Sequence, residues 1–305
     1  MLVRLIDGGL STALEEAGHK LDGRLWTARL LVDDPEAIVA AHLAFLRAGA
    51  RVLVTSSYQA SVEGFVAAGV RLEEAIELVH ATTALAIEAR RRFADEEPAG
   101  AADVLIAASV GPYGATLGDG SEYRPAVIED AMLVSFHASR LRLLIETQPD
   151  LLAIETIASA REAQAILTAL DSLPPIPAWV TFTCCDDAMT WGGDAIEDAV
   201  SAAVCGSSVI AVGVNCTAPA DVAPLLERIA CVTDLPLVAY PNGGQDWDAA
   251  EKAWHGPLHG FSADEPAAWI ALGARYVGGC CGVGPTAIAV LSEELIRKNG
   301  TRETG

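Results

Sequence analysis

Short, nearly continuous apolar runs alternate with longer amphipathic segments along the whole chain. Apolar runs of this kind are typical of strands that are buried on both faces of a parallel sheet. Polar and glycine-rich residues follow almost every run, which places a turn or loop after each expected strand. We expect eight strands, at residues 2–7, 50–56, 103–110, 151–155, 178–183, 208–215, 235–240 and 275–279.

Helical patterns occupy the segments between these strands. One begins at an Asp34-Pro35 cap and runs to Gly49, and another repeats apolar residues at helical spacing over 128–147. Eight strands that alternate with helices predict an α/β fold, a single-domain (β/α)8 TIM barrel over residues 1–305. A doubly wound open sheet is the alternative, but the turn after the first strand lacks the G-x-G-x-x-G order of a dinucleotide site.

Composition narrows the class of protein. The chain has 305 residues, 51% of them hydrophobic, and a mean hydropathy of +0.33, which is sufficient for a large core. No stretch resembles a membrane span of about 20 apolar residues, and the N-terminus lacks the pattern of a signal peptide. We therefore expect a cytoplasmic protein without a membrane partner, either a monomer or a weak homo-oligomer.

The charge balance is strongly acidic, with 20 basic against 41 acidic residues and a net charge of −21. Such a chain cannot assemble the basic face that nucleic acid requires, so we expect no nucleic-acid partner. The same charge favours solubility and a cationic small substrate.

Reactive and small residues collect where the expected strands end, which in a (β/α)8 barrel is the rim that carries the active site. The polar residues that we expect to line a substrate pocket there are Asp7, Thr55, Glu155, Asn215, Tyr240 and Asn242.

Three cysteines stand out at this rim. Cys216 ends the strand at 208–215, while Cys280 and Cys281 end the last strand, and these strand ends lie close together around a barrel. Three thiolates with an open fourth position form the ligand set of a catalytic zinc site. Gly278, Gly279 and Gly282 supply the backbone freedom that lets adjacent cysteines face one metal. Buried thiols in a tight turn and a redox dithiol stay as alternatives, although no C-x-x-C motif is present.

The other cysteines have different expected roles. Cys184 and Cys185 form a second adjacent pair at a strand end, without flanking glycines, and we expect them to line the pocket rather than bind the metal. Cys205 and Cys231 fall inside helix-like segments, where we expect small buried hydrophobic residues.

A zinc ion with three thiolate ligands is suited to activating a thiol. The metal accepts a further sulfur ligand and holds it deprotonated at neutral pH, although a free thiol has a pKa of about 8.5. Three anionic ligands also keep the metal a weak Lewis acid, so the added thiolate stays nucleophilic. Hydrolysis is better served by histidine and carboxylate ligands, and none of the six histidines falls at an expected strand end.

Several motifs together resemble those of a known family. From residue 7 to about residue 290 the chain carries, in order, DGGLSTALEEAG, TSSYQAS, GPYGATLGDGSEYR, IETIAS, GVNCTAP, YPNGG and GGCCGVGP. This series resembles the homocysteine S-methyltransferases. GVNC and GGCCG are highly specific as a pair, whereas DGG alone is a weak signal.

The resemblance implies a zinc-dependent barrel enzyme that methylates homocysteine to methionine. Cys216, Cys280 and Cys281 match the zinc ligands of the family. Asp7 and Glu155 match acidic residues that hold the amino-acid end of homocysteine, in agreement with the need of an ammonium group for carboxylate partners.

The resemblance also suggests a methyl donor. The end of the chain soon after the last helix and the GPYGATLGDGSEYR segment are similar to the branch that uses S-methylmethionine, with S-adenosylmethionine as a second donor. Both donors are sulfonium cations, which Tyr58, Tyr113 or Tyr240 could face through cation–π contacts.

Other functions stay open at this point. The same site could use betaine as donor, or act on another thiol or on a selenol such as selenocysteine. A zinc-binding or storage module without catalysis is the non-enzymatic alternative, which the acidic pair argues against. A phosphate-binding barrel is suggested by the glycines of the last two strands. A Schiff-base aldolase would need a lysine at a strand end, and Lys20, Lys252 and Lys298 all fall elsewhere.

Overall fold

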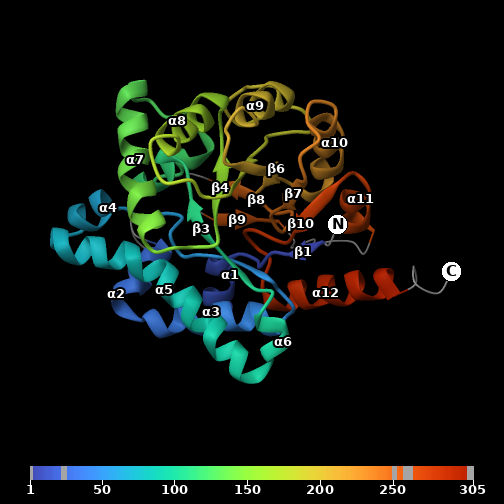
Figure 1. Cartoon of the computed structure of the whole chain (residues 1–305), viewed down its shortest axis with the longest axis horizontal. Coiled ribbons are helices and arrows are strands. Elements are labelled where there is room, and N and C mark those ends of the chain that lie inside the picture. The colour runs from blue at the N-terminus through green and yellow to red at the C-terminus, as the bar shows by residue number, and fades with distance from the viewer. Residues whose placement is uncertain (1–2, 22–25, 249–252, 257–263, 301–305) are drawn as a thin grey trace.

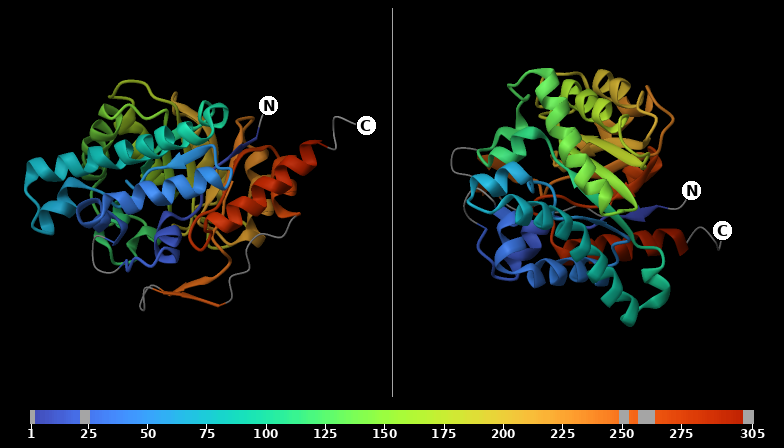
Figure 2. Two further views of the ribbon diagram at one scale, coloured as in Figure 1. Left: turned by 90° about the horizontal axis from the view of Figure 1, so that it is seen from below. Right: turned by 60° about the vertical axis from the view of Figure 1, so that its left-hand side comes forward.

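The computed structural model describes residues 3–21, 26–248, 253–256 and 264–300. Eight parallel strands form a central barrel, and helices cover it from outside (Figures 1 and 2). The barrel strands are β1 (Arg4–Leu5), β2 (Val52–Val54), β3 (Leu105–Val110), β4 (Leu151–Ile157), β5 (Ala178–Phe182), β6 (Val209–Asn215), β7 (Leu237–Tyr240) and β10 (Ala274–Val277). Each lies on a run that the apolar pattern predicts.

The strands are ordered β1-β10-β7-β6-β5-β4-β3-β2, and every neighbouring pair is parallel. The two ends of this order also meet. Ile6 forms a parallel bridge with Val52, and the Asp7 amide donates to the Val52 carbonyl at 3.0 Å. The sheet therefore closes on itself, and the expected single (β/α)8 barrel is confirmed over the open-sheet alternative.

The helices follow the predicted pattern. The Asp34 side chain accepts a hydrogen bond from the Ala37 amide at 3.2 Å, and Pro35 occupies the first helical position. None of the described helices is both long and apolar enough to cross a bilayer. The helices are α1 (Leu10–Glu16), α2 (Leu30–Asp33), α3 (Pro35–Arg47), α4 (Val62–Ala67), α5 (Leu72–Glu96), α6 (Pro98–Ala101), α7 (Asp130–Glu146), α8 (Ala160–Leu170), α9 (Ile196–Ala203), α10 (Pro219–Ala230), α11 (Glu265–Ala271) and α12 (Pro285–Gly300), with 3-10 turns η1 (Trp26–Arg29), η2 (Tyr113–Leu117) and η3 (Ser121–Tyr123).

The barrel interior is filled by side chains, so the barrel is no pore. Trp179 is fully buried there, its ring centroid 6.1 Å from that of Tyr240 and 5.5 Å from that of Tyr276. A second and larger apolar layer lies between the sheet and the surrounding helices. The packed interior leaves the rim at the carboxyl ends of the strands as the place for a site.

One feature is absent from the predicted pattern. Strands β8 (Asp246–Asp248) and β9 (Ala253–His255) pair antiparallel between β7 and α11, and they stand away from the barrel body (Figure 2). The sequence there mixes charged, small and aromatic residues and contains no long apolar run, so the rule for buried parallel strands does not detect it.

The prediction for two of the cysteines was wrong. Cys205 and Cys231 are exposed, not buried. Both lie just past the end of a helix, where each thiol donates to a carbonyl four residues earlier, that of Ser201 and Glu227 respectively. The helical periodicity continues to these residues, but the apolar face of each helix does not.

Candidate active site

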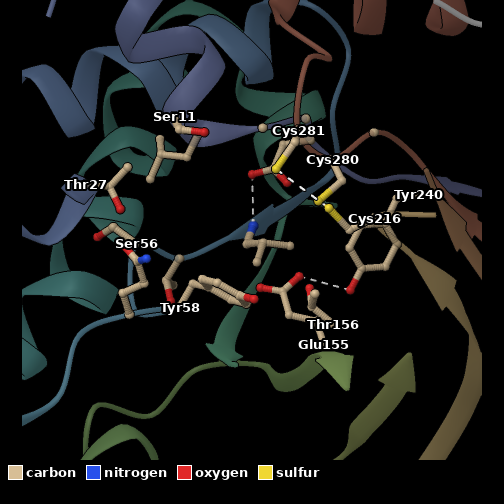
Figure 3. Close-up of a pocket in the computed structure, with 18 of the residues that line it drawn as sticks. Ser11, Thr27, Ser56, Tyr58, Glu155, Thr156, Cys216, Tyr240, Cys280 and Cys281 are labelled. Atoms are coloured by element: carbon tan, nitrogen blue, oxygen red, sulfur yellow. Dashed lines mark hydrogen bonds between the residues drawn. The ribbon is translucent and has the colours of Figure 1, made fainter. Parts of the chain in front are cut away.

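The strand ends surround a cavity at the rim of the barrel. Its empty space, with the open mouth included, is about 910 Å³. Residues after β1, β2, β6 and β10 contribute to its wall, as do Glu155 and Thr156 within β4 and Tyr240 at the end of β7. Ser11 of α1 and Thr27 of η1 also line the cavity (Figure 3). Glu122 and Tyr123 of η3 complete its wall.

Three thiols converge on one side of this cavity (Figure 3). The sulfur atoms of Cys216, Cys280 and Cys281 all lie within 4.8 Å of one another, and those of Cys216 and Cys281 are 3.7 Å apart. In the described part of the chain no other group of three or more histidine, cysteine or acidic side chains has metal-binding spacing. The structure therefore brings together the three residues that the sequence assigns to zinc.

The backbone is bent to present these thiols. Cys216 follows β6 with a φ of 48°, a left-handed conformation that is uncommon for a residue with a side chain. Its amide donates to the Tyr240 carbonyl at 3.1 Å, and the Cys280 amide donates to the Pro241 carbonyl at 2.8 Å. Main-chain hydrogen bonds to the end of β7 thus fix the chain after β6 and after β10, where the three cysteines lie.

The glycines around the cysteine pair act in two ways. Only Gly282 has a left-handed backbone, with a φ of 78°. Gly278 and Gly279 are required instead for close approach, because a Cβ atom would lie 2.7 Å from the Ile6 Cβ at the first and 2.2 Å from the Val283 Cγ1 at the second. The turn freedom that we expected from all three glycines therefore applies to Gly282 alone.

Two buried carboxylates lie in the same cavity. Asp7 Oδ2 accepts a hydrogen bond from the Val54 amide at 2.9 Å, and burial raises the pKa of this carboxyl well above its usual range. Burial also raises the pKa of Glu155 to about 7, against the opposing effect of hydrogen bonds from Ser109 Oγ and Tyr240 Oη. A cationic ligand beside these two groups would lower their pKa values and favour the carboxylate form, against the effect of burial.

Asn215 and Asn242 lie behind the thiols and do not line the cavity. Asn215 Oδ1 accepts from the Thr156 amide at 2.7 Å, and its Nδ2 donates to Thr156 Oγ1 at 2.8 Å and lies 3.9 Å from the sulfur of Cys280. Asn242 Nδ2 lies 3.4 Å from the Cys216 carbonyl oxygen. These two residues support the ligand loops, whereas Thr55 and Tyr240 face the cavity as expected.

The tyrosines divide between the cavity and the core. Tyr58 and Tyr240 line the cavity, but Tyr113 does not. Tyr113 packs edge-on against Phe136 at 5.0 Å between ring centroids, so its expected contact with a donor is not available in this structure.

Sequence reasoning missed Glu122 and Tyr123, which both line the cavity. Tyr123 Oη lies 3.5 Å from the sulfur of Cys216. Both residues belong to the loop between β3 and α7, far along the chain from any strand end, so a search of strand ends does not reach them. The GPYGATLGDGSEYR motif that contains them was the available signal.

The cavity is lined by acidic side chains and by no basic ones among the described residues. Asp7, Glu122 and Glu155 line it together with the three thiols, and no lysine, arginine or histidine does so among the described residues. Hydrogen bonds from the thiols of Cys280 and Cys281 hold the pKa of Cys216 well below its usual range. A site of this character attracts cations, both a metal ion at the thiols and an organic cation beside the carboxylates.

Cys184 and Cys185 do not line the cavity, contrary to expectation. Beyond β5 the chain folds back through an antiparallel bridge between Cys184 and Thr190. Cys184 is buried against the next loop, with its amide donating to Thr217 Oγ1 at 3.0 Å, and Cys185 is exposed. The turn of the chain thus directs both thiols away from the ligand cluster.

A closed parallel barrel with two buried carboxylates and a three-thiol cluster that could hold a metal ion at its rim places this protein in the (β/α)8 barrel class, with a candidate active site where such barrels carry one. Comparison with known proteins identifies the family to which the chain belongs. Residues 4–295 match the family model described as homocysteine S-methyltransferase. The chain belongs to the homocysteine S-methyltransferase family and is a methyltransferase.

Individual relatives agree over nearly the whole chain. It is 39% identical to homocysteine S-methyltransferase 1 of Arabidopsis thaliana, with 96% of this chain and 94% of the relative covered. It is also 39% identical to the homocysteine S-methyltransferase of Escherichia coli, over 95% and 94% of the two chains. A crystal structure of the homocysteine methyltransferase MmuM from Escherichia coli, in a metallated form, superposes with a TM-score of 0.86 at 37% identity and 96% coverage of each chain.

Proposed function

We propose that this protein transfers a methyl group from a sulfonium donor, S-methylmethionine or S-adenosylmethionine, to the thiolate of L-homocysteine, giving methionine. The observation that carries the proposal is the presence of three converging thiols and two buried carboxylates in one cavity. A metal-binding protein without catalysis would need the thiols but not the carboxylates.

The donor set fits zinc. Three sulfur atoms within 4.8 Å of one another can ligate one ion, and the cavity beside them leaves a direction open for a further ligand. When bound there by Cys216, Cys280 and Cys281, zinc would lower the pKa of an incoming thiol so that it is deprotonated at neutral pH.

The two carboxylates are suited to the amino-acid end of homocysteine. An ammonium group placed between Asp7 and Glu155 would stabilise their charged forms, which burial disfavours. Ser109 and Tyr240 hold Glu155 from behind, so its orientation is set before the substrate arrives. Homocysteine held in this way would direct its sulfur toward the thiol cluster across the same cavity.

The donor would enter from the cavity mouth. In the transfer the bond between the donor sulfur and its methyl carbon breaks, a bond from the homocysteine sulfur to that carbon forms, and the electron pair returns to the donor sulfur. The donor loses its positive charge and leaves as a neutral thioether, while the thiol proton has already passed to solvent. A cavity lined by acidic side chains, with Tyr58 and Tyr123 in its wall, supports binding of the sulfonium cation.

A second acceptor is favoured by one comparison. The chain is 36% identical to the selenocysteine Se-methyltransferase of Brassica oleracea, over 96% of this chain. A selenol would use the same chemistry as a thiol, so selenocysteine is the alternative acceptor for this site.

A direct assay tests the proposal. The purified protein is analysed for metal content, and methionine formation from homocysteine is followed with S-methylmethionine, S-adenosylmethionine and betaine in parallel. A parallel series replaces homocysteine with selenocysteine. We expect zinc near one per chain and the highest kcat/KM for homocysteine with a sulfonium donor. Transfer from betaine alone, or no transfer from any donor, would overturn the proposed reaction.

A further inference from the structure

Arg140 of α7 is buried beneath the rim, with 4% of its surface exposed, and it does not line the cavity. Its guanidinium group donates to the carbonyl oxygen of Gly111 at 2.9 Å, that of Ser57 at 2.5 Å and that of Tyr58 at 2.6 Å. The last two carbonyls belong to the loop after β2, and the first belongs to the loop after β3. One side chain therefore joins two neighbouring loops of the active-site rim.

Tyr58 links the hydrogen bonds of Arg140 to the cavity, because its backbone accepts from Arg140 and its side chain lines the cavity. Its phenol points toward Glu155 and Thr156 (Figure 3). Gly111 gives the ring its space, because a Cβ atom there would lie 2.7 Å from both Cδ2 and Cε2 of Tyr58. The backbone of Tyr58 is thus held by Arg140, and its ring is seated against a glycine that Arg140 also binds.

The positive charge of Arg140 argues against a purely structural role, because burying a charge costs free energy. Among the described residues the hydrogen bonds of Arg140 go to main-chain carbonyls and not to a carboxylate. Burial lowers the pKa of Arg140 to about 10 and outweighs Glu155 and Glu162, which favour its charge from a distance, so its burial costs free energy. An apolar side chain would fill the space without that cost. What an apolar side chain cannot supply is a rigid planar fork that donates to three carbonyls at once.

We propose that Arg140 is a positioning residue for methyl transfer, which holds Tyr58 in place in the cavity wall beside Glu155. The inference rests on the proposed function. Tyr58 is the group that contacts the substrates, and the hydrogen bonds of Arg140 act through it. The charge of Arg140 also favours the carboxylate form of Glu155, and a lysine would keep that charge. A lysine at this position would keep the charge but present a point donor without the planar fork, so the loops and the tyrosine would lose their fixed arrangement.

A double-mutant cycle tests the inference. R140K, Y58A and the double variant are compared by kcat/KM for S-methylmethionine at saturating homocysteine, with zinc content measured for each. We expect R140K to lower kcat/KM on the order of 10-fold to 100-fold with zinc content unchanged, because small misplacements of a reacting geometry carry penalties of that size. In the Y58A background R140K should have no further effect.

R161K is the matched control. Arg161 of α8 also donates to two backbone carbonyls, those of Ala126 at 2.7 Å and Ile128 at 2.5 Å, but none of these three residues lines the cavity. Its variant should retain the wild-type kcat/KM. R140Q, which keeps a planar donor, serves the same cycle should R140K not fold.

The outcomes separate the two proposals. Effects of R140K and Y58A that multiply in the double variant would overturn the positioning role, as would an R140K variant that behaves like R161K. In both cases the proposed function stands, because the wild-type enzyme still transfers methyl groups. A wild-type protein that transfers no methyl group from a sulfonium donor overturns the proposed function and this inference with it.

Discussion

Tyr240 Oη donates a hydrogen bond to Glu155 Oε2 at 3.0 Å across the barrel, from the end of β7 to β4. Tyr240 Oη also accepts a hydrogen bond from Trp179 Nε1 at 3.2 Å and lies 2.9 Å from Thr181 Oγ1. A buried network inside the barrel therefore leads directly to the carboxylate that we assign to the substrate ammonium. The network stabilises the ionised form of Glu155, whereas burial disfavours it.

Binding of the amino-acid end should therefore depend on pH. The pKa of Glu155 is about 7 in the free enzyme, so the fraction of carboxylate falls about tenfold per pH unit well below that value. We expect the affinity for L-methionine to weaken as pH falls from about 7.5 to about 5.5. Methionine is used because it carries no ionisable thiol, and titration calorimetry measures its Kd. A constant Kd across this range would contradict the assignment of Glu155.

The same carboxyl should make the protein less stable at alkaline pH. The folded-state pKa of Glu155 is raised from 4.5 to about 7, so the folded state binds the proton more tightly than the unfolded state does. Its contribution is fully present below about pH 4.5 and is lost as pH rises through about 7, a difference of a few kcal/mol.

E155Q removes this penalty and should raise Tm relative to the wild type at about pH 8 but not at about pH 5. Methyl transfer should fall in the same variant, because the neutral amide cannot pair with an ammonium group. Thermal unfolding at the two pH values provides the measurement. An equal change in Tm at both would show that the charge of Glu155 is not the cause.

Y240F tests the network that supports Glu155. The variant leaves Trp179 Nε1 without its acceptor in a fully buried site and removes one hydrogen bond from the carboxylate. We expect a loss of about 1–3 kcal/mol in stability. The pKa of Glu155 should rise further, so the loss of methionine affinity on acidification should begin at a higher pH. An unchanged pH profile in Y240F would separate Tyr240 from the substrate site.

Alanine variants of the three clustered cysteines test the metal site, and two other cysteines of the chain provide the controls. C216A, C280A and C281A should each lose bound zinc and lower methyl transfer by more than about 100-fold, since each removes a ligand from one ion. C205A and C231A should match the wild type, because those thiols are exposed and remote from the cluster. Metal analysis and initial rates give the result. Full activity in a C280A/C281A double variant would reject the metal assignment.

Much of this site follows from the sequence because it depends on two simple regularities. Continuous apolar runs mark the barrel strands, and in such a barrel all strands end at the same rim. Cys216, Cys280, Asp7 and Glu155 could therefore be placed together although they are far apart in the chain, and their convergence needs no knowledge of side-chain packing.

What the sequence does not predict depends on register and on loop conformation. The bond from Tyr240 to Glu155 requires that β4 and β7 point matching residues inward at the same height, and the two strands are not neighbours in the sheet. Tyr123 reaches Cys216 from the middle of a long loop. The left-handed backbones of Thr156 and Cys216 are likewise set by tertiary contacts, since neither residue type favours them.

Asn215 provides a last test, because its amide group lies between the carboxylate side of the site and the thiol cluster and contacts a residue of each. Its oxygen accepts from the Thr156 amide at 2.7 Å, next to Glu155, and its nitrogen lies 3.9 Å from the sulfur of Cys280. N215D keeps the acceptor but replaces the nitrogen by a second anionic oxygen beside a thiolate. We expect zinc affinity to fall about 10-fold to 100-fold, as for other groups that orient metal ligands.

A matched variant separates this local effect from the added charge. Q164E places the same extra charge on the exposed face of α8, where screening by solvent and salt makes it ineffective at the metal site. Zinc affinity is measured for both variants by competition with a chelator at one ionic strength. A weakened site in N215D with an unchanged one in Q164E is expected, because only the first substitution reverses the dipole that faces Cys280. Equal affinities in N215D and the wild type would mean that the amide nitrogen of Asn215 does not stabilise the ligand sulfur.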